Sequence, residues 1–436
     1  MGVPDVQKYA LAYRTQSYRL RGWLGRGGWA VVDQALFAGT NFMVGVLLAR
    51  WLEPAAYGAF SAAYSVFLLV GTLHTALWSE PLLVYGAGRF RESFPVYLRI
   101  LARDHWRFGA LLALGFLTAA HVAYRLSGEA LALSLVGMAG AAPLLLYLWM
   151  VRRGSYALMQ PRQAVLGGGL YLGLYLGSAY FVRQLGWLNA ASALLLMGSA
   201  ALGAAESMRY GLNRTLSEKS ELAPAVQQVR RLHWHYGRWA LVAGLLSWLP
   251  MNIYYFLLPW FYDLESVARL RALFNLALPV LHLNAALTTL AIPLFARVRA
   301  SEPARTPRLL RGLLLLLSGF TLMAGLGLYV LSDFLVDMLY DGKFWFEKGE
   351  YMLVAILPIT TLFPNILMAW IKAAEASRKV AMGYGIVSIF VMLSAPALVA
   401  MLEVKGALIG MMAAHLLLAV IFLKFARNVE NEGHGR

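Results

Sequence analysis

Twelve long apolar stretches run through this 436-residue chain, and they constrain its fold more than any other feature. A helix of roughly 20 apolar residues is long enough to cross a lipid bilayer. The chain is 60% hydrophobic and only 14% charged, which is far from the composition of a soluble domain. We therefore predict an all-α integral membrane protein with about twelve transmembrane helices. The predicted spans are residues 27–49, 55–80, 107–125, 130–151, 163–183, 186–206, 239–261, 270–296, 311–333, 351–371, 380–402 and 406–424.

The positive charges alternate along the chain and predict its orientation. Most of the 38 lysines and arginines fall before the first span, in every second gap after it, or beyond the last span. Because cytoplasmic loops of membrane proteins collect Lys and Arg, both termini should face the cytoplasm, and we predict a bacterial inner-membrane location. The same bias explains the net charge of +16 without a nucleic-acid partner. The basic gaps would instead contact anionic membrane lipids.

A polar gap between the sixth and seventh spans divides the chain into two halves. We predict a cytoplasmic N-terminal segment (1–26), a six-helix lobe (27–206), a cytoplasmic linker (207–238), a second six-helix lobe (239–424) and a cytoplasmic tail (425–436). A six-plus-six division is typical of internally repeated transporters, with a central cavity between the lobes. The mixed aromatic and basic residues of segment 1–26 fit an interfacial helix and a basic tail equally well. The gaps on the predicted outer side are short, which argues against a polymerase or ligase.

The sequence carries no signature of covalent chemistry or of a cofactor. It has no cysteine, which excludes disulfides and thiol catalysis. It has neither a Walker loop nor an HExxH motif, so neither ATP hydrolysis nor a catalytic metal is predicted. His233 and His235 lie two residues apart without an evident third ligand, and an aromatic anchor at the membrane interface is the simpler interpretation. We predict a protein that is not an enzyme and binds no metal or cofactor.

Polar side chains inside the spans mark candidate functional positions, because burying them in a bilayer is costly. In the first span, Gln34 and Asn41 are nearly two helical turns apart and share a stripe beside Asp33. We interpret this polar face as cavity lining ahead of interhelical hydrogen bonding. Glu80, near the inner end of the second span, is a candidate for ion coupling, although pairing with nearby arginines explains it as well. His74 in the same span is equally compatible with packing and with function.

The eighth span carries a second polar stripe. Arg271, Asn275 and His282 recur there at helical spacing. Arg271 lies near the predicted outer end, Asn275 lies one turn deeper, and His282 lies near mid-membrane. A cationic, hydrogen-bonding stripe of this kind suits an anionic phosphate or a sugar. The alternative is that Arg271 only extends to the outer headgroups.

The first two spans resemble those of the polysaccharide-unit flippases, which belong to the multidrug/oligosaccharidyl-lipid/polysaccharide exporter superfamily. In that family the first helix ends in a Leu-Leu-Ala-Arg element, and a short loop ending in Tyr-Gly follows. The resemblance rests on Asp33-Gln34, Thr40-Asn41, Leu47-Leu48-Ala49-Arg50, Tyr57-Gly58 and Ser79-Glu80-Pro81. It is clearest over residues 28–90, and elsewhere it consists of the span count and the six-plus-six division.

The resemblance implies two six-helix lobes around a cavity that opens to one face at a time. It also implies a substrate, an isoprenoid-pyrophosphate-linked saccharide, that moves from the inner to the outer leaflet. By position, the substrate-binding candidates are Asn41, Arg50, Arg271, Asn275 and His282. The first two spans lack an arginine deep in the membrane, unlike those of the related lipid II flippases, so that cationic cavity does not transfer directly.

Energy for such a transporter would come from the membrane potential or from an ion gradient. Asp33 and Glu80 are the predicted carriers of a proton or sodium ion, because burial tends to raise the pKa of a carboxylate. Polysaccharide-assembly proteins would be its partners. A multidrug or organic-cation exporter on the same scaffold is the alternative, and it predicts an acidic, aromatic-lined cavity. The aromatic run at 254–261 permits this, although an interfacial belt explains that run equally well.

Overall fold

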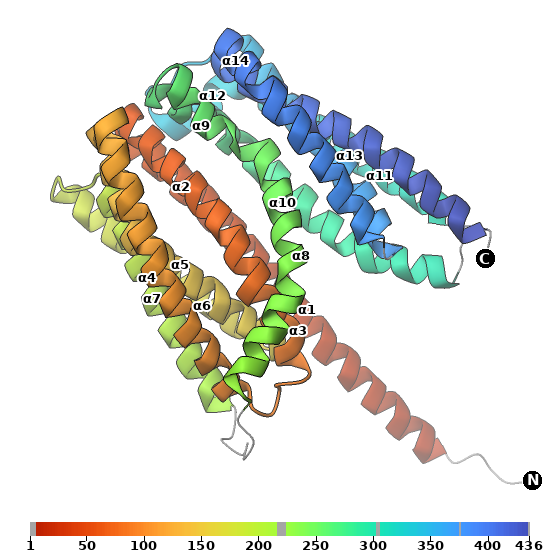
Figure 1. Cartoon of the computed structure of the whole chain (residues 1–436). Coiled ribbons are helices and arrows are strands. Elements are labelled where there is room, and N and C mark those ends of the chain that lie inside the picture. The colour runs from red at the N-terminus through yellow and green to blue at the C-terminus, as the bar shows by residue number, and fades with distance from the viewer. Residues whose placement is uncertain (1–5, 216–223, 302–305, 375, 435–436) are drawn as a thin grey trace, which may run out of the picture.

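The computed structural model describes residues 6–215, 224–301, 306–374 and 376–434, and every element assigned in these ranges is a helix (Figure 1). The elements are α1 (Val6–Trp51), α2 (Pro54–His74), the π turn η1 (Thr75–Ser79), α3 (Glu80–Ala87), α4 (Phe94–Ser127), α5 (Glu129–Ala157), α6 (Pro161–Gln184), α7 (Ala190–Thr215), α8 (Val226–Asn252), α9 (Tyr254–Phe261), α10 (Leu264–Ser301), α11 (Thr306–Val330), α12 (Ser332–Tyr340), α13 (Lys348–Ala373) and α14 (Ser377–His434).

Local sequence signals set where several of these helices begin. Pro54, Pro95 and Pro161 stand in the first turn of α2, α4 and α6. Proline fits this position because it has no N–H to leave unpaired and its φ is already helical. Glu347 and Glu350 form a reciprocal capping box at the start of α13. The helices therefore begin directly after short turns, which keeps consecutive helices antiparallel.

The described helices fit the predicted number of membrane crossings. Ten of them are long and apolar enough to span a bilayer, and α8 and α9, bent by 43° at their junction, make an eleventh span. One of the ten, within α14, runs over 51 residues from Arg378 to Asn428. At 1.5 Å per residue, a helix of that length would be about 75 Å long, more than twice the roughly 30 Å of a bilayer core.

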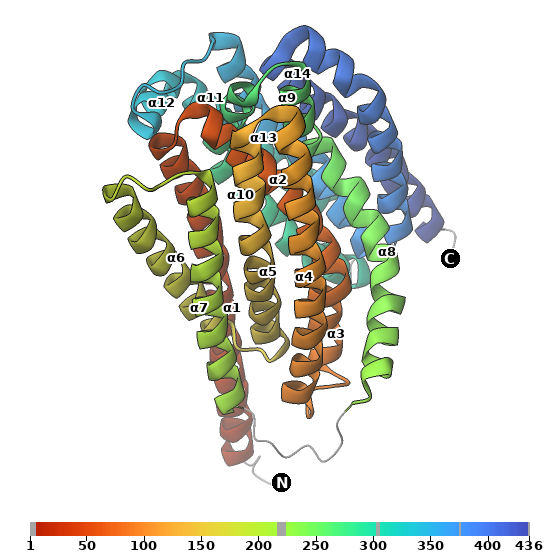
Figure 2. The ribbon, with the colours of Figure 1, turned by 60° about the vertical axis from the view of Figure 1, so that its left-hand side comes forward.

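The helix α14 is two antiparallel spans joined at Glu403 (Figure 2). Glu403 has φ 51° and ψ −125°, so the helical path breaks there. A Cβ on Gly406 would lie 2.0 Å from the Leu398 carbonyl oxygen, and one on Gly383 would lie 2.4 Å from the Phe422 ring. Both pairs are centred on the break, as the two arms of a hairpin require. The predicted spans 380–402 and 406–424 are these two arms, and the total is twelve.

Several helices extend beyond the predicted spans. The third span was predicted to begin at residue 107, whereas α4 begins at Phe94, because charged residues between 99 and 107 end the apolar run without ending the helix. α1 is helical from Val6, so the described part of segment 1–26 continues into the first span. The predicted linker 207–238 contains the end of α7 and the start of α8, and its residues 216–223 lie outside the described part. Hydropathy measures the apolar run and not the length of the helix.

The helices form two lobes, with α5 packed against α2, α4 and α7 in the first and α13 packed against α10, α11 and α14 in the second. α8 lies between them and contacts both η1 and α14. We call the end of the bundle with both chain ends the termini end, and the other the far end. Figure 1 shows the lobes close together beside α9 and α12, at the far end, and farther apart toward the termini end.

Specific contacts close the lobes against each other at the far end. A Cβ on Gly58 of α2 would lie only 1.7 Å from the Leu264 carbonyl oxygen of α10, so the two backbones touch. Lys343 donates to the Leu52 carbonyl oxygen at 2.9 Å. The rings of Tyr57 and Phe344 pack edge to face across the same boundary. These contacts hold the far end shut in this conformation.

Candidate functional site

Arg271 of α10 lies at the boundary between the lobes, surrounded by tyrosines. Its guanidinium carbon is 5.9 Å from the ring centroid of Tyr64, on α2 of the first lobe. Tyr57 of α2 and Tyr255 of α9 are its other electrostatic partners. Among the residues that the structure describes, no carboxylate forms an ion pair with Arg271, and its side chain is only partly buried. The site therefore presents a positive charge that no acidic side chain neutralises.

Asn275 continues this site by one helical turn. Its Nδ2 donates to the hydroxyl of Tyr57 at 2.9 Å. Its Oδ1 is buried and has no hydrogen-bond partner. A buried acceptor without a donor is unfavourable by about 1–3 kcal/mol. Gly45 of α1 approaches the same amide, so Asn275 lies where α1, α2 and α10 meet.

His282 lies two further turns along α10 and lines a cavity of about 330 Å³ in the second lobe. Arg271 acts electrostatically on this histidine. The cavity lies between α8, α10, α13 and α14. Its polar lining residues are Ser247, His282, Thr361, Asn365, Tyr384 and His415. Arg271, Asn275 and His282 thus follow one stripe of α10, and the stripe leads from the lobe boundary to a cavity whose lining includes these polar groups.

Asp33 is bound by an arginine of the same lobe. Arg152 of α5 donates from Nε to both carboxylate oxygens at 3.1 Å and from Nη2 to Oδ2 at 2.6 Å. The Tyr156 hydroxyl donates to the same Oδ2 at 2.5 Å. The Asp33 side chain is 1% exposed and that of Arg152 is 17% exposed. In this conformation Asp33 is therefore a neutralised carboxylate.

Two small cavities run from this ion pair toward Arg271. One, of about 220 Å³, is lined by Ser79, Arg152, Arg153 and Tyr156 among others. The next, of about 40 Å³, shares Arg152 with it and is also lined by Asn41 and Tyr64. Because Tyr64 also contacts Arg271, these polar groups form a row along α1, α2 and α5, which we call the polar route; most of the other residues that line the smaller cavity are apolar.

The other two predicted residues lie at opposite ends of the molecule. Arg50 is at the far end and pairs with Asp341 of α12 at 3.3 Å, with both side chains largely exposed. Glu80 begins α3 near the termini end, in the electrostatic field of Arg153 and Lys372. Neither joins the Arg271 site in this conformation.

Sequence reasoning missed several residues of the site. Arg152 was counted only as a loop charge, and nothing in the sequence links it to Asp33. Tyr57 and Tyr64 are seven residues apart, so their shared stripe was open to detection from periodicity. For Tyr255 the sequence left two interpretations open, an aromatic-lined cavity and an interfacial belt. His233 was interpreted as an interfacial anchor, but it is buried, with Nε2 accepting from the Tyr97 hydroxyl at 2.6 Å.

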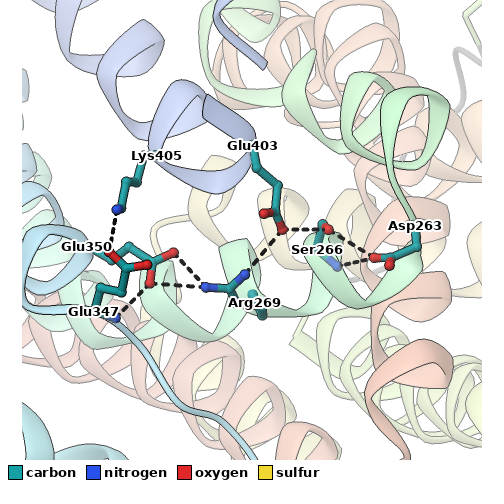
Figure 3. Close-up of polar contacts among 7 residues, drawn as sticks. All are labelled: Asp263, Ser266, Arg269, Glu347, Glu350, Glu403 and Lys405. Carbon is teal, nitrogen blue, oxygen red and sulfur yellow. Dashed lines mark hydrogen bonds and ion pairs between the residues drawn. The ribbon is translucent and has the colours of Figure 1, made fainter. Parts of the chain in front are cut away.

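A second arginine of α10, two residues from Arg271, has the opposite environment (Figure 3). Arg269 donates to Glu350 at 2.9 Å and to Glu403 at 3.2 Å. Ser266 also donates to Glu403, at 2.8 Å. Arg269 thus joins α10 to α13 and to the break in α14. Beside this cluster, the hydrogen bond from Lys405 lowers the pKa of the Glu347 carboxyl from its ordinary value.

Comparisons with known proteins agree with this architecture. A family model described as "Polysaccharide biosynthesis protein" matches residues 212–348, about a third of the chain. An inward-facing multidrug resistance MATE family transporter of the MOP superfamily, the exporter superfamily described above, aligns with TM-score 0.70 and 16% identity, over 93% of this chain and 99% of that one. An outward-facing MATE structure aligns with TM-score 0.59 and 14% identity, over 93% and 94%. No curated protein sequence matches.

The chain thus has the multi-pass helical fold that these transporters of the MOP superfamily share. The same fold occurs in a MOP superfamily transporter from Pyrococcus furiosus Vc1 (DSM3638), which is described as having a binding pocket of reverse polarity. That structure aligns with TM-score 0.60 and 14% identity, over 93% of this chain and 94% of that one. The flippase-type MOP resemblance predicted from the first two spans is confirmed, and so are the all-α fold and the two six-helix lobes.

Proposed function

We propose that this protein flips an isoprenoid-pyrophosphate-linked oligosaccharide from the cytoplasmic to the outer leaflet of a bacterial inner membrane, for polysaccharide export. It works by alternating access and performs no covalent chemistry. The observation that carries the proposal is Arg271, a positive charge between the lobes that no acid of the described chain neutralises. The family match to polysaccharide biosynthesis proteins supports the same class of cargo.

A pyrophosphate would complete the Arg271 site. A charge held inside a membrane protein is costly unless it is paired. The planar guanidinium can donate two parallel N–H hydrogen bonds to phosphate oxygens, so it recognises the shape of a phosphate as well as its charge. The hydroxyls of Tyr57 and Tyr255 are further donors. The unpaired Oδ1 of Asn275 is an acceptor for a sugar hydroxyl at the same place.

The saccharide would extend into the cavity of the second lobe. That cavity is continuous with the Arg271 stripe through His282 and carries hydroxyl, amide and imidazole groups. These groups both donate and accept hydrogen bonds, as sugar hydroxyls require. In this scheme Asn41 contributes from the first lobe, on the route that ends at Tyr64.

The conformation described here would be the loading state. The positive-charge bias predicts that the termini end faces the cytoplasm. With the far end closed, the Arg271 site would open to the cytoplasmic leaflet. The higher TM-score to the inward-facing transporter than to the outward-facing one supports this assignment. Asp33 would carry a proton or sodium ion only after Arg152 releases it, and Arg50 would act in closing the far end. Polysaccharide-assembly proteins remain its proposed partners.

The test is the leaflet accessibility of lipid-linked oligosaccharide in sealed vesicles containing the purified protein. Arg271→Ala should raise the half-saturating substrate concentration about 10- to 100-fold, because a hydrogen bond to a charged group contributes about 1.5–3 kcal/mol. Arg271→Lys keeps the positive charge but loses the paired N–H donors of the guanidinium. Its half-saturating concentration should therefore lie between those of the wild type and Arg271→Ala. Arg125→Ala, at an exposed position on α4, is the matched control. Transport that is absent in the wild type, or equal in Arg271→Ala, would refute the proposal.

A multidrug or organic-cation exporter is the second candidate. The tyrosines around Arg271 would suit an aromatic cargo, and the aligned MATE structures are titled as multidrug resistance transporters. Arg271 argues against a cationic cargo, because like charges repel at the point where the lobes meet. Unchanged drug susceptibility after deletion of the gene would remove this candidate.

A further inference from the structure

Two histidines form a buried pair in the first lobe, away from the Arg271 site. The side chains of His74 on α2 and His105 on α4 are both fully buried. Nε2 of His74 is 3.0 Å from Nδ1 of His105, and Nε2 of His105 is 3.0 Å from the Pro143 carbonyl oxygen. A carbonyl oxygen only accepts, so His105 donates from Nε2 and accepts at Nδ1. His74 therefore donates from Nε2, and its Nδ1 carries a lone pair.

That lone pair has no partner. Nδ1 of His74 is buried and makes no hydrogen bond. A buried polar atom without a partner is uncommon in native structures and calls for an explanation. Protonation would place a positive charge there, so this conformation corresponds to the neutral state of the pair. A proton at Nδ1 would favour an arrangement in which the new N–H finds an acceptor.

The pair lies next to the π turn. η1 starts at Thr75, directly after His74, and is closed by the Glu80 N–H donating to the Thr75 carbonyl oxygen, five residues back. Single π turns inside α-helices are rare and occur frequently at functional sites. Ser79, at the other end of η1, lines the 220 Å³ cavity that also contains Arg152. The turn is thus in contact both with the histidines and with the polar route.

The same π turn supports α8, which leads into the second half of the chain. His233 of α8 donates from Nδ1 to the Leu77 carbonyl oxygen at 2.8 Å. A Cβ on Gly237 would lie 2.7 Å from the Ala76 carbonyl oxygen, so the backbones are in contact. A change in the winding of η1 would therefore move α8, and with it the position of one half relative to the other.

The described groups around the histidine pair are apolar or already hydrogen-bonded, so Nδ1 of His74 is the atom that would accept a proton. Trp78 of η1 stacks on the His74 ring with centroids 5.2 Å apart, and Phe108 of α4 covers another side. Tyr147 of α5 packs on His105 and donates to Glu206 of α7. The remaining charged and titratable neighbours are already engaged: Glu206 with Arg209, Asp104 with Arg230, and His233 with Leu77 and Tyr97.

We propose that His74, with His105, is a proton-binding site through which the transporter uses a proton gradient, and that η1 transmits its protonation to the lobes. This inference rests on the proposed transport function and names its coupling ion. Uptake adds one proton to the Nδ1 lone pair of His74, and release returns it on the other side of the membrane. In this conformation Asp33 is bound by Arg152, so the histidine pair is the group that takes up the proton first.

The first experiment reads the conformation without any substrate. The chain has no cysteine, so Arg162→Cys on α6 and Arg378→Cys on α14, both exposed at the termini end, give a clean spin-label pair. In the wild-type background, the distance distribution should shift as the pH falls from about 8 to about 4, because the pair has to take up a proton to leave this conformation. In His74→Gln the shift should be lost, because Gln keeps the donor to His105 but does not titrate. His235→Gln, an exposed histidine on α8, should respond like the wild type.

The second experiment uses the sealed vesicles with an imposed pH gradient. At one proton per cycle, a gradient of one pH unit should change the steady-state leaflet ratio of the lipid-linked oligosaccharide about tenfold. His74→Gln should show no change, while His235→Gln should keep the tenfold change. His105→Gln, whose amide fills both hydrogen-bonding roles of the imidazole, should keep the tenfold change, because the proton is taken up at His74. His74→Asn replaces His74→Gln if that variant does not fold.

The outcomes separate the two proposals. If the wild type moves no lipid-linked oligosaccharide, the proposed function fails, and the distance measurement still decides the role of His74. A wild type whose lobe distance does not depend on pH overturns the proton site. So does a pH shift that persists in His74→Gln, or in His74→Asn where His74→Gln does not fold.

Discussion

The buried ion pair between Asp33 and Arg152 makes a quantitative prediction about stability. The Asp33 carboxylate is 1% exposed and receives bidentate donation from Arg152. In Arg152→Met, the Tyr156 hydroxyl would remain as its one donor among the described residues. Removing one partner of a buried pair is unfavourable by about 3–5 kcal/mol, because the other charge stays buried and uncompensated. We expect Arg152→Met to lower the free energy of unfolding by this amount.

A double-mutant cycle separates the pair from the loss of either side chain. Unfolding by sodium dodecyl sulfate in mixed micelles, followed by tryptophan fluorescence, gives the free energy for each variant. Asp33→Asn removes the charge, so Asp33→Asn combined with Arg152→Met should recover most of the loss. The coupling energy should then be about 2 kcal/mol or more, within the range measured for residues in direct contact.

The control is Arg162→Met, an exposed arginine at the start of α6. Surface substitutions of this kind change stability by about 0.5 kcal/mol or less. If Arg152→Met is no more destabilising than Arg162→Met, or if the coupling energy is close to zero, then Asp33 is not held by Arg152. In that case Asp33 would again be available as an ion carrier in this conformation.

Two further predictions concern the far end. Gly58→Ala should force α2 away from α10 at the far end, because a Cβ there would lie 1.7 Å from the Leu264 carbonyl oxygen. When the lobes separate at the far end, they should approach each other at the termini end, so the spin labels at positions 162 and 378 should move closer together. The control is Gly39→Ala, where a Cβ would meet nothing within 4 Å and the label distance should stay unchanged. Glu347 should contribute stability that is present above its unfolded pKa and is lost as the pH falls through its lowered folded pKa, because Lys405 favours the charged form. The difference in stability between wild type and Glu347→Gln should therefore be constant near neutral pH, shrink below about pH 4.5 and be small throughout, since exposed pairs contribute little. A difference that grows on acidification would contradict this.

The sequence predicts the spans well because the bilayer imposes one simple rule. An apolar run of sufficient length must cross the membrane as a helix, since the lipid core offers no hydrogen-bond partner to the backbone. That rule correctly predicts the two arms of α14 as separate spans, although α14 counts as one helix across the break at Glu403. It fails at helix ends such as 94–106 of α4, where the helix continues outside the apolar run. The π turn at Thr75–Ser79 carries no mark in hydropathy at all.

The candidate site was predictable only where it follows one helix. Arg271, Asn275 and His282 share a face of α10 by periodicity alone. The partner of Asp33 is 119 residues away in the chain, and only tertiary packing brings Arg152 to it. Likewise, Arg50 and Arg271 both stand near the predicted outer ends of their spans. Their environments differ because one points to an exposed aspartate and the other to the lobe boundary.

The two arginines of α10 have opposite environments, and the difference supports the role proposed for Arg271. Residues two apart on a helix point to opposite sides, so Arg269 and Arg271 cannot share their partners. Arg269 meets Glu350 and Glu403, which neutralise it and fix α13 and the α14 break to α10. Among the described residues Arg271 meets tyrosines and no carboxylate, and its side chain is partly buried at the boundary between the lobes. An acid beside Arg271 would stabilise the empty protein and would compete with an anionic cargo for the same guanidinium. In the proposed function, the absence of such an acid among the described residues leaves the free energy of pairing to the cargo, so that binding, rather than folding, would neutralise this charge.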